Sequence, residues 1–450
     1  MENFSGKKVA VLGFGLEGKD LCSFLLQQKA SITVFDEKEN FETDKDYQNF
    51  KKEGVIFLLG SDSLKNGLQD FEIVFRSPGF KYLSPVITEA LKNKVKISSA
   101  TKLFFELCKG RIIGVTGTKG KGTTSTLIAE ILKNSQKKVF LAGNVGQPML
   151  SLLPNIDEAS WVVLELSSFQ LEDLAQGPYI AVILFIASEH LDHHQNQQEY
   201  IEAKANLVKY QNDKDMVVLN DDDEISSSFA KLTKAKVFSF SSKIKTNGAY
   251  VQDKNIYLFD RQLGETNKLQ ILGQHNWQNV CAAATAASLA GADFEAIQKT
   301  IFAFKGLEHR LEFVRNFQEI DFYNDSFSTT PETAIAAIDS FQKPIVLIAG
   351  GSDKGSDFKA LGQKITNSSV KTLILIGLMA LKIRQAVEEA GFKGKIIFQP
   401  SKEMKAIVNL ASQEAKTGEA VLLSPACASF DLFANYKDRG LQFKENVKAL

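Results

Sequence analysis

The stretch GVTGTKGKGTTS at residues 114–125 constrains the fold of this chain most, because it places a glycine and lysine turn between a strand pattern and a helix pattern. The preceding residues 111–115 are mostly apolar, and residues 123–134 carry apolar side chains at helical spacing. Such a turn directs backbone N–H groups and the open N-terminus of a helix at an anion, and Lys121 adds a positive charge. The pattern predicts a phosphate-binding loop.

The loop nevertheless departs from the usual pattern GxxxxGK[ST] at two positions. Val115 occupies the position of the first glycine, and Gly122 stands where a hydroxyl usually ligates magnesium. A surface turn rich in glycine and lysine therefore stays open as an alternative, and other parts of the chain must decide between the two.

Length and charge limit the class of protein. A chain of 450 residues is too long for one ordinary core and predicts about three domains of roughly 150 residues each. Its 53 basic and 53 acidic residues cancel, so no overall field attracts the chain to nucleic acid or to an anionic membrane. We expect neither as a partner.

Cysteine usage and the N-terminus predict a soluble cytoplasmic protein. The four cysteines lie far apart without a CxxC pair, so neither a zinc site nor a disulfide framework is indicated. The start MENFSGKKVAVLG leads directly into a strand and a glycine turn, without the apolar segment of a signal peptide. No apolar run approaches the roughly 20 residues that cross a bilayer.

The N-terminal region has the pattern of a nucleotide-binding unit. Residues 8–35 predict a strand, a turn, a helix and a second strand; the turn GFGLEG has the spacing GxGxxG, and Asp36 follows about 20 residues later. Taken alone, this pattern predicts a NAD-dependent dehydrogenase. The same geometry holds any diphosphate, so it indicates a nucleotide-like ligand rather than NAD itself. A short strand before SPGF brings Ser77 and Gly79 to the sheet edge where ligands lie.

Charged side chains follow two apolar strands of the central region. Glu165 ends the strand pattern WVVLEL, where a buried carboxylate is costly unless it meets a cation; a magnesium ligand is favoured over an accident of the core. His190 comes first after the next strand, in SEHLDHH, and is the better ligand candidate. We expect His193 and His194 to be solvated loop residues, and the acidic run DDDE at residues 221–224 to be a solvated turn.

The remaining pattern predicts a three-domain α/β protein with parallel sheets. Residues 231–270 predict short antiparallel strands inserted in the central unit, and GQHNWQN opens a long helix. Strands and helices then alternate to the C-terminus. We expect a Rossmann-like domain at 1–108, a central phosphate-loop ATPase-like domain at 109–304 and a second Rossmann-like domain at 305–450.

Nine motifs in order resemble one family, the Mur ligases of peptidoglycan synthesis. They are TGTKGKGTT, GNVGQP, LELSSFQLE, SEHLD, GQHNWQN, GLEHRLE, NDS, GGSDKGSDF and SPACASFDLFANYKDRG. The resemblance covers essentially the whole chain, and the last two motifs are similar to those of the glutamate-adding member.

The resemblance implies an ATP-dependent amide ligation. The enzyme would join glutamate, by this resemblance D-glutamate, to UDP-N-acetylmuramoyl-L-alanine through an acyl phosphate. ATP and Mg²⁺, with two ions, are the implied cofactors, and a monomer is expected.

Lys204 looks like the family lysine that is carbamylated, because a carbamate can ligate magnesium whereas an ammonium would be repelled. The alternative is an exposed helix lysine.

The resemblance also assigns residues to five sets. The implied catalytic residues are Lys121, Glu165, His190 and Lys204; the implied metal ligands are Thr123, Glu165, His190 and Lys204. The implied ATP-binding residues are Gly117, Thr118, Lys119, Gly120, Lys121, Gly122, Thr123, Thr124, Asn276, Asn279, Arg310 and Asp325. The implied UDP-substrate residues are Gly15, Leu16, Asp36, Ser77, Gly79, Asn144 and Gln170. The implied amino-acid residues are Thr329, Lys354, Ser429, Phe430 and Tyr436.

Two departures from the family pattern affect these expectations. Because Gly122 lacks a hydroxyl, we expect Thr123, or Thr124 after a small shift, to contact the metal. Phe327 replaces the lysine that the glutamate-adding family typically has in NDSKAT, which leaves open whether D- or L-glutamate is added. The sequence STTP after NDS is compatible with the L-glutamate branch.

Two functions of other classes remain as alternatives. A NAD-dependent dehydrogenase would explain GxGxxG and Asp36 but leaves the second and third domains unexplained. A non-catalytic nucleotide-binding regulator would explain the irregular loop but would not need Glu165, His190 and Lys204 together.

Overall fold

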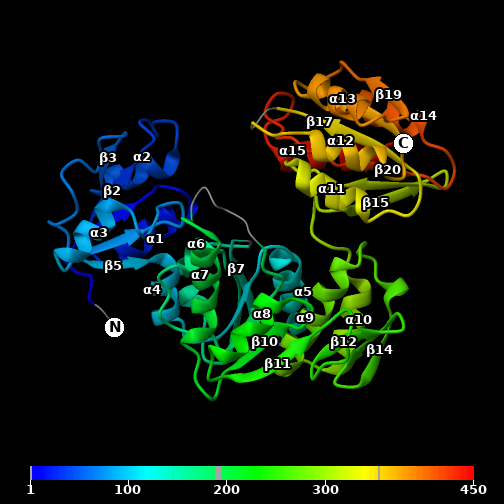
Figure 1. Ribbon diagram of the computed structural model, residues 1–450. Coiled ribbons are helices and arrows are strands. Elements are labelled where there is room, and N and C mark those ends of the chain that lie inside the picture. The colour runs from blue at the N-terminus through cyan, green and yellow to red at the C-terminus, as the bar shows by residue number, and fades with distance from the viewer. Residues whose placement is uncertain (1–2, 145, 188–193, 353–354) are drawn as a thin grey trace. The chain divides into compact units, whose positions relative to one another are not determined.

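The computed structural model describes residues 3–144, 146–187, 194–352 and 355–450, which divide into two compact units (Figure 1). The first unit comprises Met1–Asn267 and Trp277–Ile301, and the second comprises Lys268–Asn276 and Phe302–Leu450. Each unit is built on parallel sheets with helices packed against them. The expected α/β class is therefore confirmed, whereas the domain boundaries after residues 108 and 304 remain predictions.

The first unit begins with a parallel sheet of strand order β3-β2-β1-β4-β5. Its strands are β1 (Lys8–Leu12), β2 (Ser31–Asp36), β3 (Ile56–Leu59), β4 (Ile73–Arg76) and β5 (Lys96–Ser99). The helices that connect or follow them are α1 (Leu16–Gln27), α2 (Lys45–Lys52), α3 (Pro85–Lys92) and α4 (Ala100–Leu107). Four of the five residues of β1 are buried, as expected for a parallel strand covered on both faces.

The same unit contains the central parallel sheet, of strand order β11-β10-β9-β6-β8-β7. Its strands are β6 (Arg111–Thr116), β7 (Val139–Gly143), β8 (Trp161–Glu165), β9 (Ile180–Ile183), β10 (Met216–Asn220) and β11 (Lys236–Phe240). Its helices are α5 (Lys121–Asn134), η1 (Leu150–Asn155), α6 (Ser168–Leu171), α7 (Gln197–Lys209), α8 (Glu224–Ser228), η2 (Phe229–Lys231), α9 (His275–Leu289) and α10 (Phe294–Ala303). Helix α9 crosses the division between the units at Asn276 and Trp277.

A small antiparallel sheet follows the central strands, as the sequence predicts for residues 231–270. It consists of β12 (Ala249–Gln252), β13 (Asn255–Leu258) and β14 (Arg261–Glu265), before the short η3 (Thr266–Lys268). The prediction was wrong for the first part of this range. Strand β11 pairs in parallel with β10 and extends the central sheet, because the helices α8 and η2 between the two strands provide a crossover connection.

The second unit is a sheet sandwiched between two layers of helices, of strand order β15-β16-β20-β17-β18-β19. Its strands are β15 (Glu312–Phe317), β16 (Ile320–Asn324), β17 (Ile345–Gly350), β18 (Val370–Ile376), β19 (Lys395–Phe398) and β20 (Ala420–Leu423). Its helices are α11 (Pro331–Asp339), α12 (Lys359–Thr366), α13 (Ala380–Glu389), α14 (Met404–Glu414) and α15 (Tyr436–Lys448). Only the pairing of β15 with β16 is antiparallel in this described sheet.

Strand β17 shows how the period of a strand builds this sandwich. Ile345 and Leu347 join one apolar cluster, which includes residues of α11, α12 and α13. Val346 and Ile348 join the opposite cluster, which includes residues of α14 and α15. Because alternate side chains point to opposite faces, a fully apolar strand requires helices on both sides.

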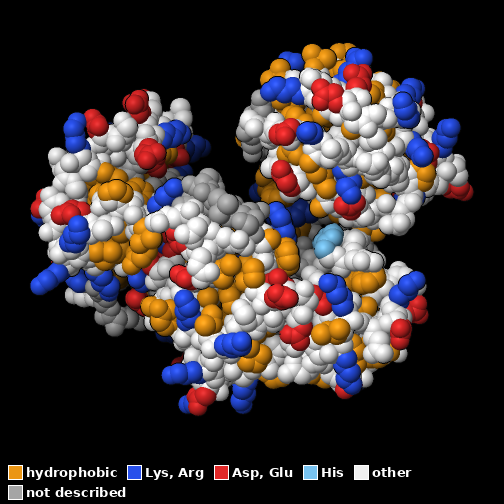
Figure 2. All heavy atoms as spheres, in the orientation of Figure 1, with side chains coloured by type: hydrophobic (Ala, Val, Ile, Leu, Met, Phe, Trp, Pro, Cys, Tyr) orange, Lys and Arg blue, Asp and Glu red, His pale blue; other side chains and the backbone are white. Residues whose placement is uncertain are grey.

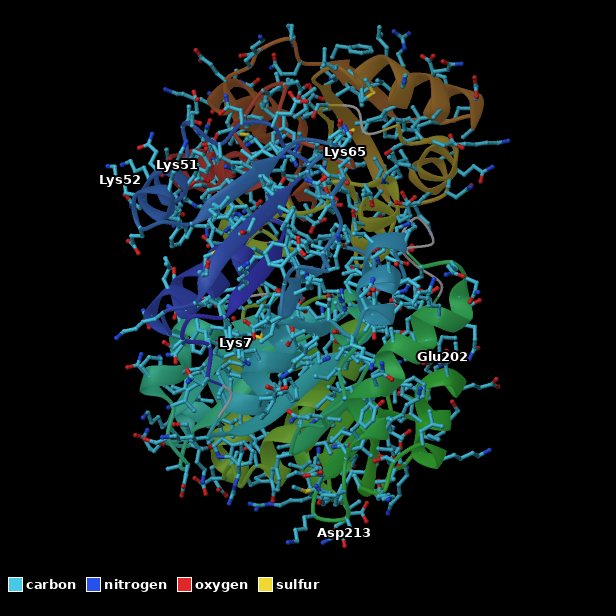
Figure 3. All side chains as sticks on the ribbon, turned by 90° about the vertical axis from the view of Figure 1, so that its left-hand side faces the viewer. Lys7, Lys51, Lys52, Lys65, Glu202 and Asp213 are labelled. Carbon is cyan, nitrogen blue, oxygen red and sulfur yellow. The ribbon has the colours of Figure 1, made fainter. Side chains whose placement is uncertain are left out.

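Surface charge is mixed on the face that Figure 2 shows, where lysine and arginine side chains alternate with aspartate and glutamate. This agrees with the balance of 53 basic and 53 acidic residues. Charged side chains such as Lys51, Lys52 and Asp213 extend outward from their elements (Figure 3). Within the described ranges, no helix combines the length and the apolar character that a membrane crossing requires.

Candidate active site

The predicted phosphate loop lies between β6 and α5, as the sequence indicates. Gly120 caps α5 with a left-handed φ of +84°, and no side chain caps this helix end. The Lys121 ammonium folds over the loop and donates to the carbonyls of Gly117 (3.0 Å) and Thr118 (3.1 Å). The loop therefore offers an open helix N-terminus together with a lysine, the two features that bind phosphate.

Neighbouring side chains leave no room for a Cβ at two glycines of this loop. A Cβ at Gly117 would lie 2.7 Å from Cβ of Leu184, and a Cβ at Gly120 would lie 2.2 Å from Oδ1 of Asn279. The same Asn279 oxygen accepts a hydrogen bond from the Thr124 hydroxyl (3.3 Å). Asn279, predicted to bind ATP, thus lies directly against the phosphate loop.

The hydroxyls of the loop differ in their surroundings. Thr118 is buried and bonded to Tyr200 (Oγ1 to Oη, 2.9 Å) and to Ala187, so its side chain holds the loop in place. Thr124 is buried against Asn279, whereas Thr123 is only partly buried, in the first turn of α5. Lys119 is exposed. Thr123 is therefore the more accessible of the two predicted metal contacts.

Glu165 ends β8 beside the phosphate loop, because Val115 of β6 is its register partner. Its side chain is 3% exposed. Oε1 accepts a hydrogen bond from Nδ2 of Asn144 (2.9 Å), and Oε2 is buried without a hydrogen-bond partner in the described part of the chain. A buried carboxylate oxygen left in this state is costly, and a divalent cation would satisfy it. The residue thus fits the predicted magnesium site.

Lys204 is buried beside the same loop, which rules out the exposed helix lysine of the alternative interpretation. Its residue is 1% exposed, and Nζ lies 3.0 Å from the Gly117 carbonyl oxygen and 3.4 Å from Oγ1 of Thr116. Glu202, two residues earlier on α7, is exposed and points away from the ribbon (Figure 3). The amphipathic helix therefore turns Lys204 inward, toward the loop that also holds Lys121.

The histidine predictions have different outcomes. His190 and His193 lie outside the described residues. The prediction that His194 is solvated was wrong: it is buried, with Nε2 2.9 Å from Oγ of Ser168 and Nδ1 3.5 Å from Oε1 of Glu199. The ring also stacks on Phe169, with the ring centroids 5.5 Å apart. Partners on α6 and α7 compensate for the desolvation of the imidazole.

The prediction of a solvated acidic turn after β10 holds for Asp221 and Glu224, which are exposed, and was wrong for the two residues between them. Asp222 accepts hydrogen bonds from Ser242 and from Gln278 at the start of α9 (2.9 Å). Asp223 is buried and accepts from the backbone N–H groups of Ile186 (3.1 Å) and Ser226 (3.0 Å). These carboxylates satisfy backbone and amide donors of neighbouring loops, which is a structural role.

The predicted nucleotide site of the first sheet is assembled at the carboxyl ends of its strands. Gly15 caps α1 without a side-chain bond, and the following Leu16 is 67% exposed. Asp36 accepts from the backbone N–H of Phe14 in the glycine turn (2.7 Å). A Cβ at Gly13 would lie 2.4 Å from Oγ of Ser77, so β1 and β4 deliver the two predicted loops to one place. Gly79 is exposed nearby.

Two residues predicted to contact the UDP substrate form hydrogen bonds to protein groups in this structure, and their contact with the substrate stays a prediction. Asn144 donates to Glu165, as described above. The Gln170 amide donates to Oε1 of Glu17 (2.6 Å) and accepts from the Ser167 backbone (2.9 Å). Sequence reasoning did not anticipate Glu17, although it lies inside the GFGLEG turn.

The second unit groups several predicted residues at the end of β16. Asp325 is buried, accepting from Ser424 Oγ (2.8 Å) and from the backbone N–H of Leu311 (3.1 Å). Burial raises the pKa of Asp325 to about 7, against the opposing effects of these bonds and of Arg310. Near neutral pH this carboxyl can therefore act as a donor as well as an acceptor. Thr329 is half-buried in the loop that precedes α11.

Arg439 holds the predicted amino-acid loops together, a role that the sequence did not reveal. Its fully buried guanidinium donates to Oγ and O of Ser326 (2.9 Å each) and to the Cys427 carbonyl (3.2 Å). Burial lowers the pKa of Arg439 to about 10, so it remains charged. Ser429 is buried in the loop held in this way, and Phe430 is 70% exposed. Arg439 belongs to the motif YKDRG, which was the only signal for it.

Phe327, which replaces the expected lysine, lies between two predicted site residues. The Arg310 guanidinium carbon lies 3.8 Å from the centre of its ring, and the Tyr436 ring meets it edge-on at 5.1 Å. Asn276 belongs to the same unit and donates to the Leu272 carbonyl (2.6 Å). Lys354 lies outside the described residues.

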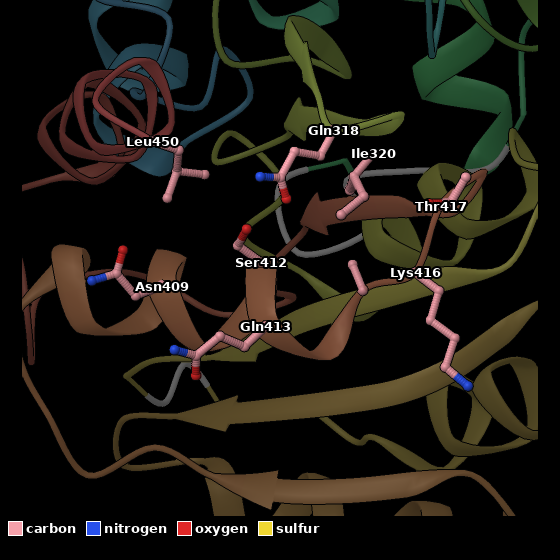
Figure 4. Close-up of a pocket in the computed structure, with 9 residues that line it drawn as sticks. Gln318, Ile320, Asn409, Ser412, Gln413, Lys416, Thr417 and Leu450 are labelled. Atoms are coloured by element: carbon pink, nitrogen blue, oxygen red, sulfur yellow. The ribbon is translucent and has the colours of Figure 1, made fainter.

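The second unit also has a cavity of about 620 Å³, which none of the predicted site residues described in that unit lines (Figure 4). Ile320, the first residue of β16, lines it together with Lys416 and Thr417, which precede β20. Asp325 follows the other end of β16, so the cavity opens at the opposite edge of the sheet. We assign it no part in the site.

Fold and site together define a multidomain α/β protein built on a phosphate-binding loop with a buried acidic residue beside it. Three family profiles match the chain: the Mur ligase MurD-like N-terminal domain at residues 7–99, the Mur ligase middle domain at 115–287 and the Mur ligase glutamate ligase domain at 309–427. The chain belongs to the Mur ligase family.

Full-length relatives agree with this assignment. A protein of Acetivibrio thermocellus named UDP-N-acetylmuramoylalanine–D-glutamate ligase is 39% identical, with 100% of this chain and 98% of that protein covered. A protein of the same name from Thermoanaerobacter pseudethanolicus is 38% identical over 99% of both chains. The crystal structure of UDP-N-acetylmuramate-alanine ligase from Thermotoga maritima shares the three-domain fold, with a TM-score of 0.59, 16% identity and coverage of 98% and 99%.

The close approach of Asn279 to the phosphate loop predicts the effect of one substitution. Gly120→Ala combines a left-handed φ with a Cβ in steric conflict with Oδ1 of Asn279, so the loop or the Asn279 side chain, which accepts from Thr124, must shift. We expect KM for ATP to rise at least about tenfold, equivalent to a loss of about 1.4 kcal/mol. Steady-state kinetics at varied ATP concentration measure it.

Gly54→Ala is the matched control, because Gly54 has a φ of +90° and nothing within 4 Å of an added Cβ. It should lower stability by about 1 kcal/mol and leave KM for ATP unchanged. An unchanged KM in Gly120→Ala would show that the loop geometry does not govern ATP binding.

Proposed function

We propose that this chain is an ATP-dependent ligase that joins D-glutamate to UDP-N-acetylmuramoyl-L-alanine in cytoplasmic peptidoglycan precursor synthesis. The observation that carries the proposal is the buried, unsatisfied Oε2 of Glu165 beside the phosphate loop. Such an arrangement is suited to a magnesium-bound triphosphate. The substrates follow from the name of the relatives, which are D-glutamate ligases by that name.

The first step would activate the substrate carboxylate. A carboxylate oxygen attacks the γ-phosphorus of ATP, and the bond from that phosphorus to the β,γ-bridging oxygen breaks. The products are ADP and an acyl phosphate of the substrate. Both reactants are anions, so catalysis consists mainly of alignment and charge neutralisation. Lys121 and the N–H groups of residues 117–123 would hold the β and γ phosphates, with Asn279 fixing the loop.

Glu165 and Thr123 are the described residues that would hold a magnesium ion at the phosphates, and Lys204 and His190 would serve a second ion. When bound, Mg²⁺ supplies positive charge that neutralises and aligns the phosphate and carboxylate oxygens. Two ions are our proposal on the basis of these two groups of residues. Asn144 would orient the Glu165 carboxylate through the bond to Oε1.

The second step would form the amide. The amine nitrogen of glutamate attacks the acyl carbon, a tetrahedral intermediate collapses, phosphate leaves and a proton is released. No protein nucleophile is needed. Thr329, Lys354, Ser429, the Phe430 backbone and Tyr436 would hold glutamate, and Arg439 keeps their two loops in register. Asn276, Arg310 and Asp325 would hold the adenosine and phosphate groups of ATP.

Phe327 is the specific observation that keeps L-glutamate as a second candidate substrate. The lysine expected at this position would place a cation beside the amino-acid loops. Here the cation near that position is Arg310, which stacks on the Phe327 ring at 3.8 Å, an arrangement that is favourable for an arginine. Since a positive charge is thereby retained, and the relatives are named for D-glutamate, we favour D-glutamate.

Phosphate release provides the direct test of this function. Incubated with ATP, Mg²⁺ and UDP-N-acetylmuramoyl-L-alanine, the protein should release phosphate when D-glutamate is added, at least about a hundredfold faster than with L-glutamate, because stereochemical inversion would misplace the amine. Faster release with L-glutamate would move the assignment to the other branch. No release with either amino acid, together with tight NAD binding, would contradict the ligase.

Lys204 is proposed to act as its carbamate, formed when the neutral amine adds carbon dioxide. Nζ is buried beside Gly117 and Thr116, so a carbamate on it would lie next to the phosphate loop. We expect a carbamate signal in ¹³C NMR after addition of ¹³C-bicarbonate and Mg²⁺. Lys204→Arg is the control, since it keeps the charge but cannot be carbamylated. A spectrum identical to that of the variant would show that Lys204 stays a free amine.

A further inference from the structure

Glu17 lies in the first turn of α1, the helix whose open N-terminus forms the predicted diphosphate site. Its carboxylate is turned inward, where it lines a cavity of about 10 Å³ beneath the glycine turn together with Arg76 and Ser77. There Oε1 accepts a hydrogen bond from Nε2 of Gln170, 2.6 Å away and 153 residues later in the chain. The bond joins the first sheet region to the central one.

Both polar atoms of the Gln170 side chain are engaged in hydrogen bonds within the protein. Its Oε1 accepts from the Ser167 backbone N–H at 2.9 Å, and the Ser167 hydroxyl accepts from the Gln170 backbone at 3.3 Å. This reciprocal pair is a capping box at the start of α6. The residue is also 2% exposed. Its amide nitrogen is consequently aimed at Glu17.

The capping box is only two residues from Glu165, the proposed magnesium ligand. A shift of Ser167 would therefore move the end of β8. Arg76 adds a second link, since its guanidinium donates to the Phe169 carbonyl (2.8 Å) and pairs with Asp173 (2.6 Å). Ser77, the next residue after Arg76, belongs to the predicted nucleotide site. The segment after Glu165 is thus held by the two elements that would bind the nucleotide.

A negative charge at this position opposes the ligand that the helix end would bind. A carboxylate in the first turn competes with a diphosphate for the same partial positive charge. Among the groups around it, Arg76 stabilises the ionised form and Asp20, one turn later on α1, destabilises it. Burial is the largest effect and raises the pKa of Glu17 to about 7.

We propose that Glu17 is a positioning residue for the nucleotide substrate: through its bond to Gln170 it fixes the diphosphate-binding end of α1 relative to Glu165, and it takes up a proton when the diphosphate binds. The inference rests on the proposed function, because it uses that substrate. The proton goes to the carboxyl oxygen that does not bond to Gln170, so the bond survives. Substrate affinity should therefore fall as the pH rises from about 6.5 to 8.5. In this range Glu17 is increasingly ionised in the free protein and must take up a proton from solvent before the diphosphate can bind.

Calorimetry with UDP-N-acetylmuramoyl-L-alanine tests the proton uptake. Its diphosphate is a diester and does not titrate near pH 7, so titrations at pH 7.5 in buffers of different ionisation enthalpy report protein groups. Wild-type protein should take up a measurable fraction of a proton, and Glu17→Gln should remove that uptake. Glu106→Gln, an exposed glutamate on α4, is the control and should keep it. Equal uptake in wild type and Glu17→Gln would overturn the proton linkage.

An exchange of the two side chains tests the positioning role. Glu17→Ala should raise KM for the UDP substrate about tenfold, with a smaller change in kcat. The bond to Gln170 that positions the helix end is lost, whereas Glu17 is already neutral in the bound state, so removing its carboxyl relieves no repulsion there. Gln170→Glu alone places two carboxyls in contact and should raise it similarly. The double variant Glu17→Gln/Gln170→Glu restores a donor and an acceptor, and should return KM to within about threefold of wild type.

The results distinguish this inference from the proposed function. A double variant no better than Gln170→Glu, with all variants folded by thermal melting, would overturn the role of Glu17 while wild-type ligation stands. A wild-type protein that binds no UDP-N-acetylmuramoyl-L-alanine would instead contradict the proposed function.

Discussion

A buried carboxylate at the end of a parallel strand is the constraint on which the arrangement of the first unit depends. Glu165 lies in an apolar strand, and only one of its two oxygens is satisfied by the described protein, through Asn144. Leaving a charged oxygen in this state costs free energy unless a cation completes it. The surroundings agree with that need, because the strand is paired with β6, which leads into the phosphate loop. The unsatisfied oxygen and the anion-binding loop together describe a place for a metal-bound phosphate.

The loop itself is positioned by contacts from distant parts of the chain. Lys121 and Lys204 both reach the Gly117 carbonyl, one from the helix that starts at the loop and the other from α7. Asn279 closes the opposite side against Gly120. Two ammonium groups at one carbonyl suit a site that will receive a polyanion. This crowding is the physical reason for our proposal that Lys204 loses its charge by carbamylation.

Local patterns in the sequence predicted the strands and loops well, since apolar runs bounded by turns specify parallel strands. The strand, turn, helix and second strand predicted for residues 8–35 are present as β1, the glycine turn, α1 and β2. The same patterns failed wherever a polar side chain finds a partner far along the chain. His194 and Asp222 were expected in solvent but are bonded to other loops, and Glu17 meets Gln170 across 153 residues. Periodicity reports which face of an element is apolar, whereas such pairings are set only when the elements pack.

The position of the metal relative to Glu165 tests this account most directly. Crystals grown with Mn²⁺ and a non-hydrolysable ATP analogue would locate the ion by its anomalous scattering. The account predicts a peak at coordination distance, about 2.1 Å, from Oε2 of Glu165 and in contact with the phosphate oxygens. An ordered analogue on the phosphate loop with the ion bound elsewhere, and Glu165 still without a partner at Oε2, would contradict it.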